Sequence, residues 1–358
     1  MIAGGRHVLF VGGGSAGHVV PSIPLIHHFR DAGWRVTYVG SGAPEKDLIP
    51  ALQVEFFSIP SGKLRRYWST KNVLDVFRML AGIWQATRLL RRLQPDVIFS
   101  KGGFVAFPVV LGAWLNRIPV VAHESDLTPG LANRLSAPFV DVVCTSFVET
   151  QLGRARVKHT GTPLRPELLN GVADRGRELC GFDTGKPLLL VVGGSLGSDV
   201  INTAVRRGIR HLTKRFNVAH VCGPGRVDAR LRGQPGYRQF EYIDAGWGDV
   251  LAAADLVVSR AGANAVFELA ALGKPSLLIP LSAQASRGDQ IDNARYAERQ
   301  GWSRVLVEED LDHERLLVEL IGLESRAVTL RQRNAPSDAT ATIAGVIESV
   351  ARTPAAQR

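Results

Sequence analysis

The sequence predicts an α/β protein built from two Rossmann-like, doubly wound domains that face one another across a cleft. Short runs rich in β-branched residues alternate with helical patterns, which favours parallel strands joined by crossover helices. This pattern restarts after residues 160–163, which are typical of a linker. A length of 358 residues also suits two domains of about 150–200 residues better than one.

The strands are expected at short apolar runs bounded by turn residues. In the first half these runs are 7–11, 35–39, 54–59, 96–100, 118–122 and 141–145. In the second half they are 187–192, 217–222, 237–243, 255–259, 275–280 and 302–307. The longest helix is expected at about 71–93. We expect an N-terminal domain at 1–162 and a C-terminal domain at 163–338, with an amphipathic helix within 339–358 that folds back onto the first domain.

Composition restricts the class of partner and the compartment. The net charge of +10 favours an anionic partner, either nucleic acid, an anionic membrane or a phosphorylated substrate. Nucleic acid is disfavoured because the basic residues lack an aromatic stacking platform or a recognition module. The three cysteines lie far apart, which indicates a reducing compartment without disulfides. The longest apolar stretch, 104–115, is too short to span a bilayer of about 30 Å, so we expect a cytoplasmic protein whose membrane contact is peripheral.

A glycine-rich loop at residues 12–18 follows the first strand and matches the pattern G-x-G-x-x-G. A dinucleotide site would also need an acidic residue at the end of the second strand, where Gly40 and Ser41 stand instead. No nicotinamide or flavin cofactor is therefore expected. Glycines let the backbone approach a ligand closely, and the amides of a helix start attract phosphate. The plainer interpretation is a tight turn without a ligand.

Two segments of the second half resemble phosphate-binding elements. Residues 193–197 repeat the strand–glycine loop arrangement, and a helix is expected to open at Ser195. A second helix is expected to begin near Ala263, where its amides would hold a diphosphate. Glu268, one turn further along, could accept hydrogen bonds from both hydroxyls of a ribose, although it could also be a solvated helix residue. A third glycine turn at 101–104 is expected to shape the acceptor side.

These segments resemble the MurG family, the UDP-N-acetylglucosamine:lipid I N-acetylglucosaminyltransferases, which have the GT-B fold. The likeness runs from Gly12 to about residue 300. The family motifs GGTGGH, HEQN, GNPVR, GGSQGA, RSGA…E and the Gln-rich segment ending in NA correspond to residues 13–18, 123–126, 161–165, 193–198, 260–268 and 290–294. Ala16, Asp126 and Asp289 depart from the family pattern, and a carboxylate near a diphosphate is unfavourable unless it is paired.

The resemblance implies the reaction and its substrates. Such enzymes transfer N-acetylglucosamine from UDP-N-acetylglucosamine, with inversion, to the 4-hydroxyl of the muramic acid of undecaprenyl-diphospho-muramoylpentapeptide, converting lipid I to lipid II in peptidoglycan synthesis. No metal or cofactor is expected, since helix dipoles and arginine can stabilise the leaving diphosphate. The expected substrate-binding residues are Gly14, Ser15, Ala16, Gly17, Asp126, Arg165, Gly194, Ser195, Ile243, Arg260, Gly262, Ala263, Asn264, Ala265, Val266, Phe267, Glu268, Asp289 and Gln290.

The base that takes the acceptor proton has three candidates. His18 is the first choice, because a histidine at a helix start has a lowered pKa and stays neutral and able to accept a proton. Glu124 and Asp126 are rival bases on the acceptor side. A histidine that only caps its own loop is the plainer interpretation of His18.

The helix at 71–93 combines basic and apolar residues, as a helix lying on an anionic leaflet does. The residues expected to face the membrane are Phe77, Leu80, Ile83, Trp84, Arg88 and Trp114. The wider basic cluster comprises Lys63, Arg65, Arg66, Lys71, Arg78, Arg88, Arg91 and Arg92. Helical spacing would equally let Leu74, Phe77, Leu80 and Trp84 pack inward, so part of this stripe is expected in the core.

Three other functions stay open at this point. Another GT-B transferase could move a UDP sugar to a diacylglycerol or a small-molecule acceptor. A non-hydrolysing sugar-nucleotide epimerase has the same two-domain plan, but a membrane-facing patch would serve no purpose in it. A catalytically silent UDP-sugar-binding module that recruits partners to the membrane is the alternative outside the enzymes.

Overall fold

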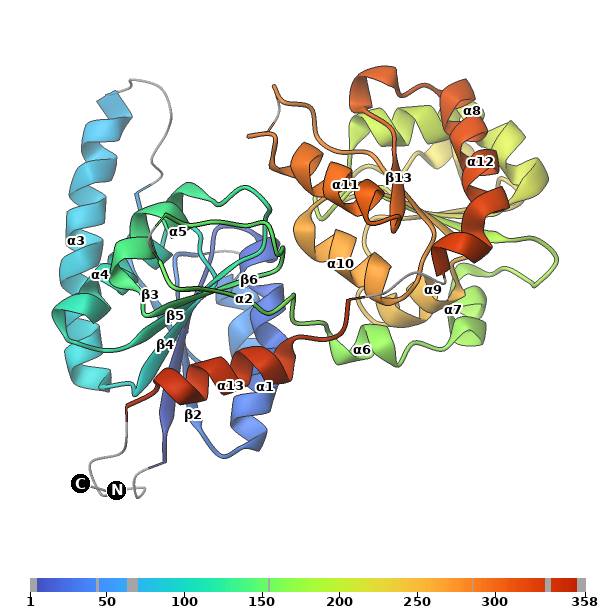
Figure 1. Cartoon of the computed structure of the whole chain (residues 1–358). Helices are drawn as coiled ribbons and strands as arrows, with labels where there is room; N and C mark the ends of the chain where they lie inside the picture. The colour runs from blue at the N-terminus through green and yellow to red at the C-terminus, as the bar shows by residue number, and fades with distance from the viewer. Residues whose placement is uncertain are drawn as a thin grey trace. The chain divides into compact units, whose positions relative to one another are not determined.

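The computed structural model describes residues 5–42, 45–62, 70–153, 155–284, 286–331 and 336–352, and it leaves out the side chains of residues 16, 70–76 and 328–331. The chain divides into two compact units. One comprises Met1–Pro163 and Asp338–Arg358, and the other comprises Leu164–Ser337. We call them the N-terminal unit and the C-terminal unit. Each is a parallel sheet with helices on both faces (Figure 1), so the predicted fold class is confirmed.

The N-terminal unit contains a seven-stranded sheet in the order β3-β2-β1-β4-β5-β6-β7. Its strands are β1 (His7–Val11), β2 (Arg35–Gly40), β3 (Glu55–Ser58), β4 (Val97–Ser100), β5 (Val120–Glu124), β6 (Val142–Thr145) and β7 (Val157–His159). Its helices are α1 (Ile23–Asp31), α2 (Glu45–Ala51), α3 (Thr70–Leu93), α4 (Ala106–Leu115), α5 (Leu131–Ser136) and α13 (Thr340–Val350). Three 3₁₀ turns, η1 (Ala16–His18), η2 (Val20–Ser22) and η3 (Ala137–Phe139), complete the described part of the unit.

The C-terminal unit contains a six-stranded sheet in the order β10-β9-β8-β11-β12-β13. Its strands are β8 (Leu188–Val192), β9 (Asn217–Val221), β10 (Tyr237–Phe240), β11 (Leu256–Ser259), β12 (Ser276–Leu278) and β13 (Ser303–Val305). Its helices are α6 (Pro166–Leu169), α7 (Ala173–Cys180), α8 (Asp199–Arg215), α9 (Trp247–Ala253), α10 (Ala263–Ala271), α11 (Asp289–Arg299) and α12 (His313–Arg331), with 3₁₀ turns η4 (Ala229–Leu231) and η5 (Glu308–Asp310).

The central strands are buried on both faces, as parallel sheets covered by helices require. All five residues of β1 and all five of β9 are buried. Each sheet therefore packs apolar side chains on both of its faces. In the C-terminal unit, one cluster includes residues of α9, α10 and α11, and the other includes residues of α8 and α12. Cys144, Cys180 and Cys222 are buried and reduced.

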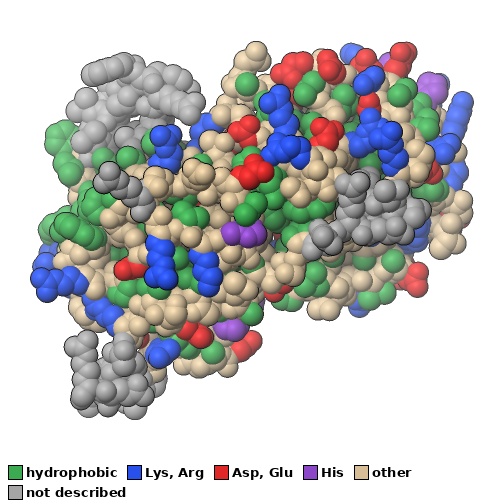
Figure 2. Space-filling view, viewed as in Figure 1, with side chains coloured by type: hydrophobic (Ala, Val, Ile, Leu, Met, Phe, Trp, Pro, Cys, Tyr) green, Lys and Arg blue, Asp and Glu red, His purple; other side chains and the backbone are tan. Residues whose placement is uncertain are grey.

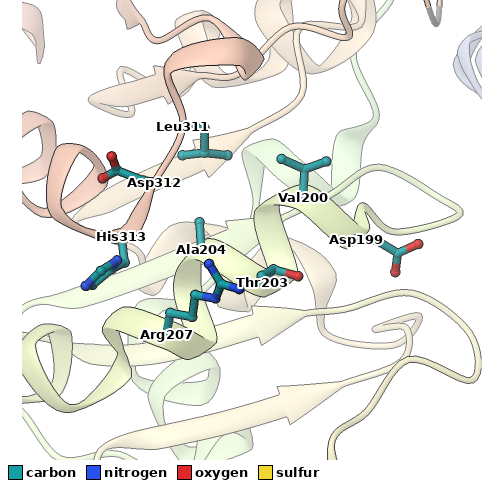
Figure 3. A pocket seen from close by; sticks show the side chains of 8 residues that line it. All are labelled: Asp199, Val200, Thr203, Ala204, Arg207, Leu311, Asp312 and His313. Carbon is teal, nitrogen blue, oxygen red and sulfur yellow. The ribbon is translucent and has the colours of Figure 1, made fainter.

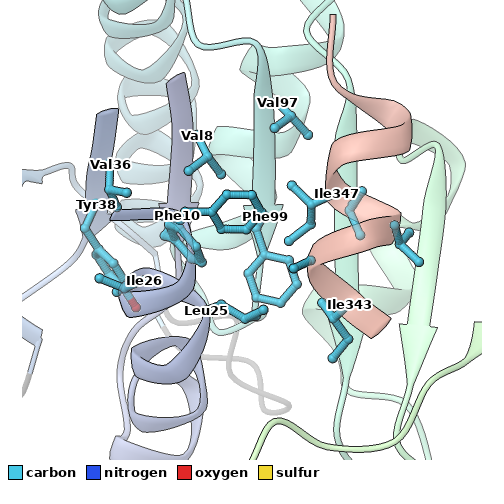
Figure 4. Close-up of a cluster of buried hydrophobic side chains, with 14 of the residues drawn as sticks. Val8, Phe10, Leu25, Ile26, Val36, Tyr38, Val97, Phe99, Ile343 and Ile347 are labelled. Carbon is cyan, nitrogen blue, oxygen red and sulfur yellow. The ribbon is translucent and has the colours of Figure 1, made fainter. Parts of the chain in front are cut away.

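Helix α13 belongs to the core of the N-terminal unit although it lies at the far end of the chain. Its Ile343 and Ile347 are fully buried in one cluster with Phe10 and Phe99 (Figure 4). Burial of an isoleucine side chain stabilises a fold by about 1.5–3 kcal/mol. The amide of Ala339 also donates to the carbonyl of Thr162 at 3.3 Å. The last helix thus anchors the C-terminal end of the chain in the core of the N-terminal unit, after the chain has left the C-terminal unit.

Strand β7 is the one strand of the described residues that the sequence pattern does not predict. It spans Val157–His159, lies at the edge of the sheet and has three exposed residues. An exposed edge strand of three residues has no buried face, so it shows neither the apolar run nor the alternation by which strands are recognised. The other strands lie at the predicted places, with ends that differ by up to three residues.

Candidate functional site

Both glycine loops lie at the carboxyl ends of strands where the order of the sheet reverses. In the N-terminal unit the loop 12–18 follows β1, between β2 and β4. In the C-terminal unit the loop 193–197 follows β8, between β9 and β11, and residues 260–262 follow β11. Ligands of doubly wound sheets bind at such reversal points. The predicted binding segments therefore lie where each sheet can hold a ligand.

Helix α10 begins at Ala263, as predicted. Its N-cap is Gly262, which is extended and has no side chain to accept from the first amides of the helix. A Cβ built on Gly262 would meet nothing within 4 Å, so space is open beside the helix start. The partial positive charge of these amides favours an anion there.

Arg165 and Glu268 form a bidentate ion pair within the C-terminal unit. The Arg165 Nε and Nη2 atoms lie 3.3 Å from Glu268 Oε1 and Oε2, respectively. Both side chains are largely but not fully buried. Burial raises the pKa of the Glu268 carboxyl, against a smaller lowering by the Arg165 guanidinium. The residue predicted for the diphosphate and the residue predicted for the ribose thus lie side by side, with Glu268 in the middle of α10.

The second glycine loop is a tight turn that ends one residue before α8. Gly194 and Gly197 have φ of +89° and +73°, and the Gly197 amide donates to the Gly194 carbonyl at 3.0 Å. Helix α8 begins at Asp199 with Ser198 as its N-cap. The prediction of a helix start at Ser195 is therefore wrong, because the positive φ of Gly197 ends the turn before helical geometry begins. Ser195 lies at the exposed tip of the loop.

Arg260 is buried inside the C-terminal unit, with 8 % of its surface exposed. Its guanidinium donates to the carbonyls of Ile279 and Pro280 at 3.1 and 3.2 Å and to Ser198 Oγ at 2.7 Å, and it pairs with Glu308. These contacts engage both terminal nitrogens of the guanidinium, and a direct contact between Arg260 and the substrate stays a prediction. Arg260 connects the N-cap of α8 to the loop after β12.

The remaining predicted donor residues lie at the same edge of the C-terminal sheet or on the helices that follow it. The Oε1 atom of Gln290 accepts from the Leu281 amide at 3.1 Å, which fixes the orientation of its side-chain amide. Asp289 is the first residue of α11, where the helix dipole favours a carboxylate, and its Oδ2 lies 3.7 Å from Arg287. Asp289 is therefore paired with a basic residue. Ile243 is buried in the turn after β10. The members of α10 between its start and Glu268, namely Asn264, Ala265, Val266 and Phe267, range from half-buried to buried.

In the N-terminal unit the first glycine loop is held by a buried carboxylate that the sequence analysis missed. Glu45 accepts from the amides of Ser41 and Gly42 at 2.8 and 3.1 Å and from the Gly14 amide at 3.4 Å. A Cβ on Gly13 would lie 2.3 Å from Glu45 Oε1, so a larger residue there would displace this carboxylate. The positions of Gly14, Ser15 and Gly17 are exposed, while the side chain of Ala16 lies outside the described residues.

His18 ends the 3₁₀ turn η1, and its amide donates to the Ser15 carbonyl at 3.1 Å. Helix α1 begins only at Ile23. The expectation that His18 lies at the start of the first helix is therefore wrong, because a second 3₁₀ turn separates it from α1. Its half-buried side chain nevertheless lies beside the glycine loop at the reversal point of the sheet.

Glu124 closes the loop 125–130 and is 4 % exposed. Its carboxylate accepts from the Asp126 amide, the Gly130 amide and Asn133 Nδ2, each at 2.9 Å. A carboxylate that accepts three hydrogen bonds in a buried position shapes a loop rather than taking a proton from a substrate. This geometry argues against Glu124 as the base and leaves His18 and the half-buried Asp126 as candidates.

The two hollows found on the C-terminal unit are lined by residues other than those predicted for the site. One, of about 340 Å³, is lined by side chains of α8 and of the segment at the start of α12 (Figure 3). The other, of about 520 Å³, is lined by residues that precede β8, β9 and β10, at the opposite edge of the sheet from the glycine loop. Within the described residues, no cluster of three or more potential metal ligands is found, and no helix is long and apolar enough to cross a membrane.

Two family models match the chain. The glycosyltransferase family 28 N-terminal domain matches residues 8–145, and the glycosyltransferase family 28 C-terminal domain matches residues 188–348. Together they cover most of both units.

Two curated relatives share about half of the residues. Both are named UDP-N-acetylglucosamine–N-acetylmuramyl-(pentapeptide) pyrophosphoryl-undecaprenol N-acetylglucosamine transferase. The protein from Legionella pneumophila (strain Lens) is 53% identical over 317 residues, 87% of each chain. The protein from Geobacillus thermodenitrificans is 47% identical over 354 residues, 97% of this chain and 99% of the relative.

Solved structures show the same fold. The crystal structure of Acinetobacter baumannii MurG is 26% identical, has a TM-score of 0.75 and covers 96% of this chain and 99% of its own. A putative UDP-N-acetylglucosamine 2-epimerase from Listeria monocytogenes, 13% identical with a TM-score of 0.68 and covering 97% and 96% of the two chains, shares the fold alone. By its domain matches and its identity to these relatives, the chain belongs to glycosyltransferase family 28 and, within it, to the MurG family.

Proposed function

We propose that this chain transfers N-acetylglucosamine from UDP-N-acetylglucosamine to the 4-hydroxyl of the muramic acid in lipid I and so forms lipid II in peptidoglycan synthesis. Membership of the MurG family supports this reaction. The observation that supports it in the structure is the bidentate contact between Arg165 and Glu268 of α10, a helix whose N-cap is a glycine with open space beside it. UDP contains both a diphosphate and a ribose diol. The arginine that suits the diphosphate and the carboxylate that suits the diol contact each other in this structure.

The donor half of the site belongs to the C-terminal unit. The amides at Ala263 and the Arg165 guanidinium supply positive charge to the diphosphate, and the glycine loop 193–197 lets backbone approach it. Glu268 accepts from the two ribose hydroxyls, which requires it to share or exchange its present contact with Arg165. The uracil lies against backbone near Ile243, and Gln290 contacts hydroxyls of the sugar. Arg260 holds Ser198 and the loop after β12 in place.

The chemistry requires one displacement. The acceptor hydroxyl oxygen forms a bond to the anomeric carbon, the bond from that carbon to the diphosphate oxygen breaks, and UDP leaves with the electron pair. The hydroxyl proton passes to a base. His18 is our first choice for this base and Asp126 is its rival, both in the N-terminal unit. The negative charge that develops on the departing diphosphate is stabilised by the amides at the start of α10 and by Arg165, without a metal.

The transfer assay that tests this function compares donors and acceptors. Labelled UDP-N-acetylglucosamine is incubated with a short-chain lipid I analogue, and parallel reactions contain UDP-glucose or diacylglycerol. We expect transfer from UDP-N-acetylglucosamine to the lipid I analogue alone. Transfer only to diacylglycerol would instead assign the chain to the other GT-B transferases, and UDP binding without any transfer would support the silent binding module.

We also propose that the N-terminal unit docks on an anionic membrane through α3 and the end of α4. Phe77, Leu80 and Trp84 are 65%, 55% and 59% exposed, so the expectation that they pack inward is wrong. Trp114 of α4 is 55% exposed. The side facing the sheet carries Ala86 and Leu90 instead. Figure 2 shows green apolar side chains at the edge where α3 and α4 lie, with blue basic residues nearby.

The basic residues on this surface are arranged around the apolar ones. Arg88 lies 4.8 Å above the Trp84 ring, and Ile83 is half-buried beside them. Lys63, Arg65 and Arg66 lie outside the described residues, as do the side chains of Lys71 and Leu74, so the surface is described by Phe77, Leu80, Trp84, Arg88, Arg91 and Trp114. A basic residue near an anionic leaflet contributes about 1 kcal/mol.

Neutralising two of these charges is expected to weaken vesicle binding. The double variant Arg88→Gln/Arg91→Gln should lose about 2 kcal/mol, or roughly 30-fold, in affinity for phosphatidylglycerol vesicles measured by sedimentation. The matched control is Arg207→Gln/Arg210→Gln on the exposed face of α8, which should sediment like the wild type. Equal loss in both variants would show that only net charge matters, and no loss in either would remove this surface from membrane docking.

A further inference from the structure

A lysine is buried at the end of β4 in the N-terminal unit. Lys101 is 2 % exposed. Its Nζ lies 2.6 Å from His123 Nδ1 and also donates to Ser125 Oγ. It opens the glycine turn 101–104, in which a Cβ on Gly103 would lie 2.2 Å from the Gly13 carbonyl oxygen. Lys101 thus joins the first glycine loop to the loop 125–130.

The hydrogen bonds around Lys101 specify one proton arrangement. A protonated lysine has three donors and no acceptor, so His123 Nδ1 must accept from it. His123 Nε2 lies 3.0 Å from the Gly161 carbonyl, to which it must therefore donate. Burial and the Lys101 charge hold the pKa of His123 well below its usual value, so the ring stays neutral. Since both ring nitrogens are hydrogen-bonded, His123 connects Lys101 to the Gly161 carbonyl and has no free nitrogen to take a proton from a substrate.

Burying the charge of Lys101 in the core costs desolvation free energy. Its two hydrogen-bond partners among the described residues are neutral, and desolvation lowers its pKa to about 8 against the raising effects of Glu124, Asp126 and Cys144. Replacing a buried charge by an apolar side chain of similar volume is often neutral or stabilising. A charge that packing does not require, at the ligand-binding edge of a sheet, indicates a functional role.

The loop 125–130 is held from two sides. The Glu124 carboxylate accepts hydrogen bonds from the amides of Asp126 and Gly130, near the two ends of the loop. Lys101 donates a hydrogen bond to the Ser125 hydroxyl. The half-buried Asp126 lies in the chain between Ser125 and Gly130, and its charge raises the pKa of Lys101. Removal of the Lys101 donor leaves Ser125 without this anchor and frees His123 to adopt its other tautomer.

We infer that Lys101 is a positioning residue for the acceptor half of the reaction: in its protonated form it fixes Ser125 and the tautomer of His123, and so sets the loop that carries Asp126. This inference rests on the proposed transfer to a lipid-linked acceptor. It assigns no contact between Lys101 and the substrate, because the ammonium group is enclosed. When Lys101 loses its proton, the amine can also accept, so the single tautomer of His123 is no longer enforced.

The Lys101→Met variant tests the inference through its pH profile. In the wild type, kcat/KM for the lipid I analogue should fall as the pH rises through about 8, where Lys101 loses its proton. The other titratable neighbours do not compete there. His123 is neutral, burial raises the pKa of Cys144 to about 11, and burial also raises that of Tyr38, whose hydroxyl donates to Gly12 beside Lys101. The variant should lose this alkaline limb and about 100-fold in kcat/KM, the effect of a small misplacement of reacting groups.

Three companion measurements separate positioning from folding and from the proposed function. The melting temperature of Lys101→Met at neutral pH should be no lower than that of the wild type, and its UDP affinity should be unchanged. Ser125→Ala should lower kcat/KM but keep the alkaline limb, because the charge remains. Lys186→Met is the matched control: its Nζ donates to the Thr213 carbonyl at 2.7 Å in the C-terminal unit, and its pH profile should match the wild type.

Hydrogen exchange of the amides in 125–130 gives a readout that does not depend on activity. It should be faster in Lys101→Met than in the wild type, even if the wild type transfers no sugar to lipid I and the proposed function fails. An unchanged alkaline limb together with unchanged exchange in the variant would overturn the role of Lys101. A loss of activity that merely follows a lowered melting temperature would also overturn it.

Discussion

Replacement of His18 by alanine is expected to lower the turnover number for lipid I by about 10²–10⁴-fold, the usual contribution of a general base. The half-buried imidazole lies beside the glycine loop, at the reversal point of the N-terminal sheet. Because the proposed donor residues all lie in the C-terminal unit, the affinity for UDP should not change. Steady-state kinetics and UDP titration calorimetry on the same preparation measure both quantities.

Two variants make the His18 result decisive. His27→Ala alters an exposed histidine on α1 and should behave like the wild type. Asp126→Asn removes the rival base while keeping the size of the side chain. If Asp126→Asn loses far more turnover than His18→Ala, the proton passes to Asp126 and not to His18. Wild-type turnover in His18→Ala would lead to the same conclusion about His18.

Replacement of Gly197 by alanine is expected to destabilise the C-terminal unit by about 3 kcal/mol or more, from left-handed strain plus steric overlap. Gly197 has φ of +73°, and a Cβ there would lie 1.9 Å from the Cys222 carbonyl oxygen and 2.9 Å from Gly223 Cα. Both contacts are with backbone, so either the glycine loop or the turn after β9 must move. Urea unfolding of the full chain measures the free energy, and the displaced loop should also weaken UDP binding.

Gly225 supplies the matched control for this variant. Its φ of +69° is close to that of Gly197, but a Cβ there would meet nothing within 4 Å. Gly225→Ala should therefore cost only the strain of the left-handed conformation, about 1 kcal/mol. If the two alanine variants unfold at the same urea concentration, the close approach of the loop to β9 does not contribute to stability.

The strands could be predicted from the sequence because most of them are buried on both faces and read as short apolar runs. β1 and β8 illustrate this, since each is a run of five apolar or nearly apolar residues followed by glycine. The helix start at Ala263 was also predictable, because Gly262 precedes a helix-forming run directly after a strand. β7 was not predictable, since an exposed edge strand of three residues lacks both periodicities.

The parts of the site that were predicted wrongly depend on turn geometry and on contacts distant in sequence. The pattern after β1 and after β8 does not reveal how many residues a glycine turn uses, so the helix starts expected at His18 and Ser195 come four or five residues later. Arg260 was predicted to bind the substrate directly. Only the fold places it against Ser198 and the loop after β12.

Lys101 and Glu45 are residues whose structural roles the sequence did not reveal. Each is a charged residue next to a glycine turn, and nothing in the sequence distinguishes it from a solvated side chain. The fold buries both and gives them partners on other elements, 22 residues away for Lys101 with His123 and 31 for Glu45 with Gly14. A charged residue directly after an apolar strand, as Lys101 follows β4, is the one sequence signal that could have indicated it.

The central claim is that Glu268 receives the ribose of the donor, and a ligand that lacks the ribose hydroxyls tests it most directly. Calorimetry would compare UDP with 2′,3′-dideoxy-UDP on the wild type and on Glu268→Gln. The wild type should prefer UDP by about 10- to 100-fold, the worth of hydrogen bonds to a charged group, and Glu268→Gln should lose most of this preference. A Glu268→Gln variant that still prefers UDP as strongly as the wild type would contradict the account, because the ribose would then be bound elsewhere.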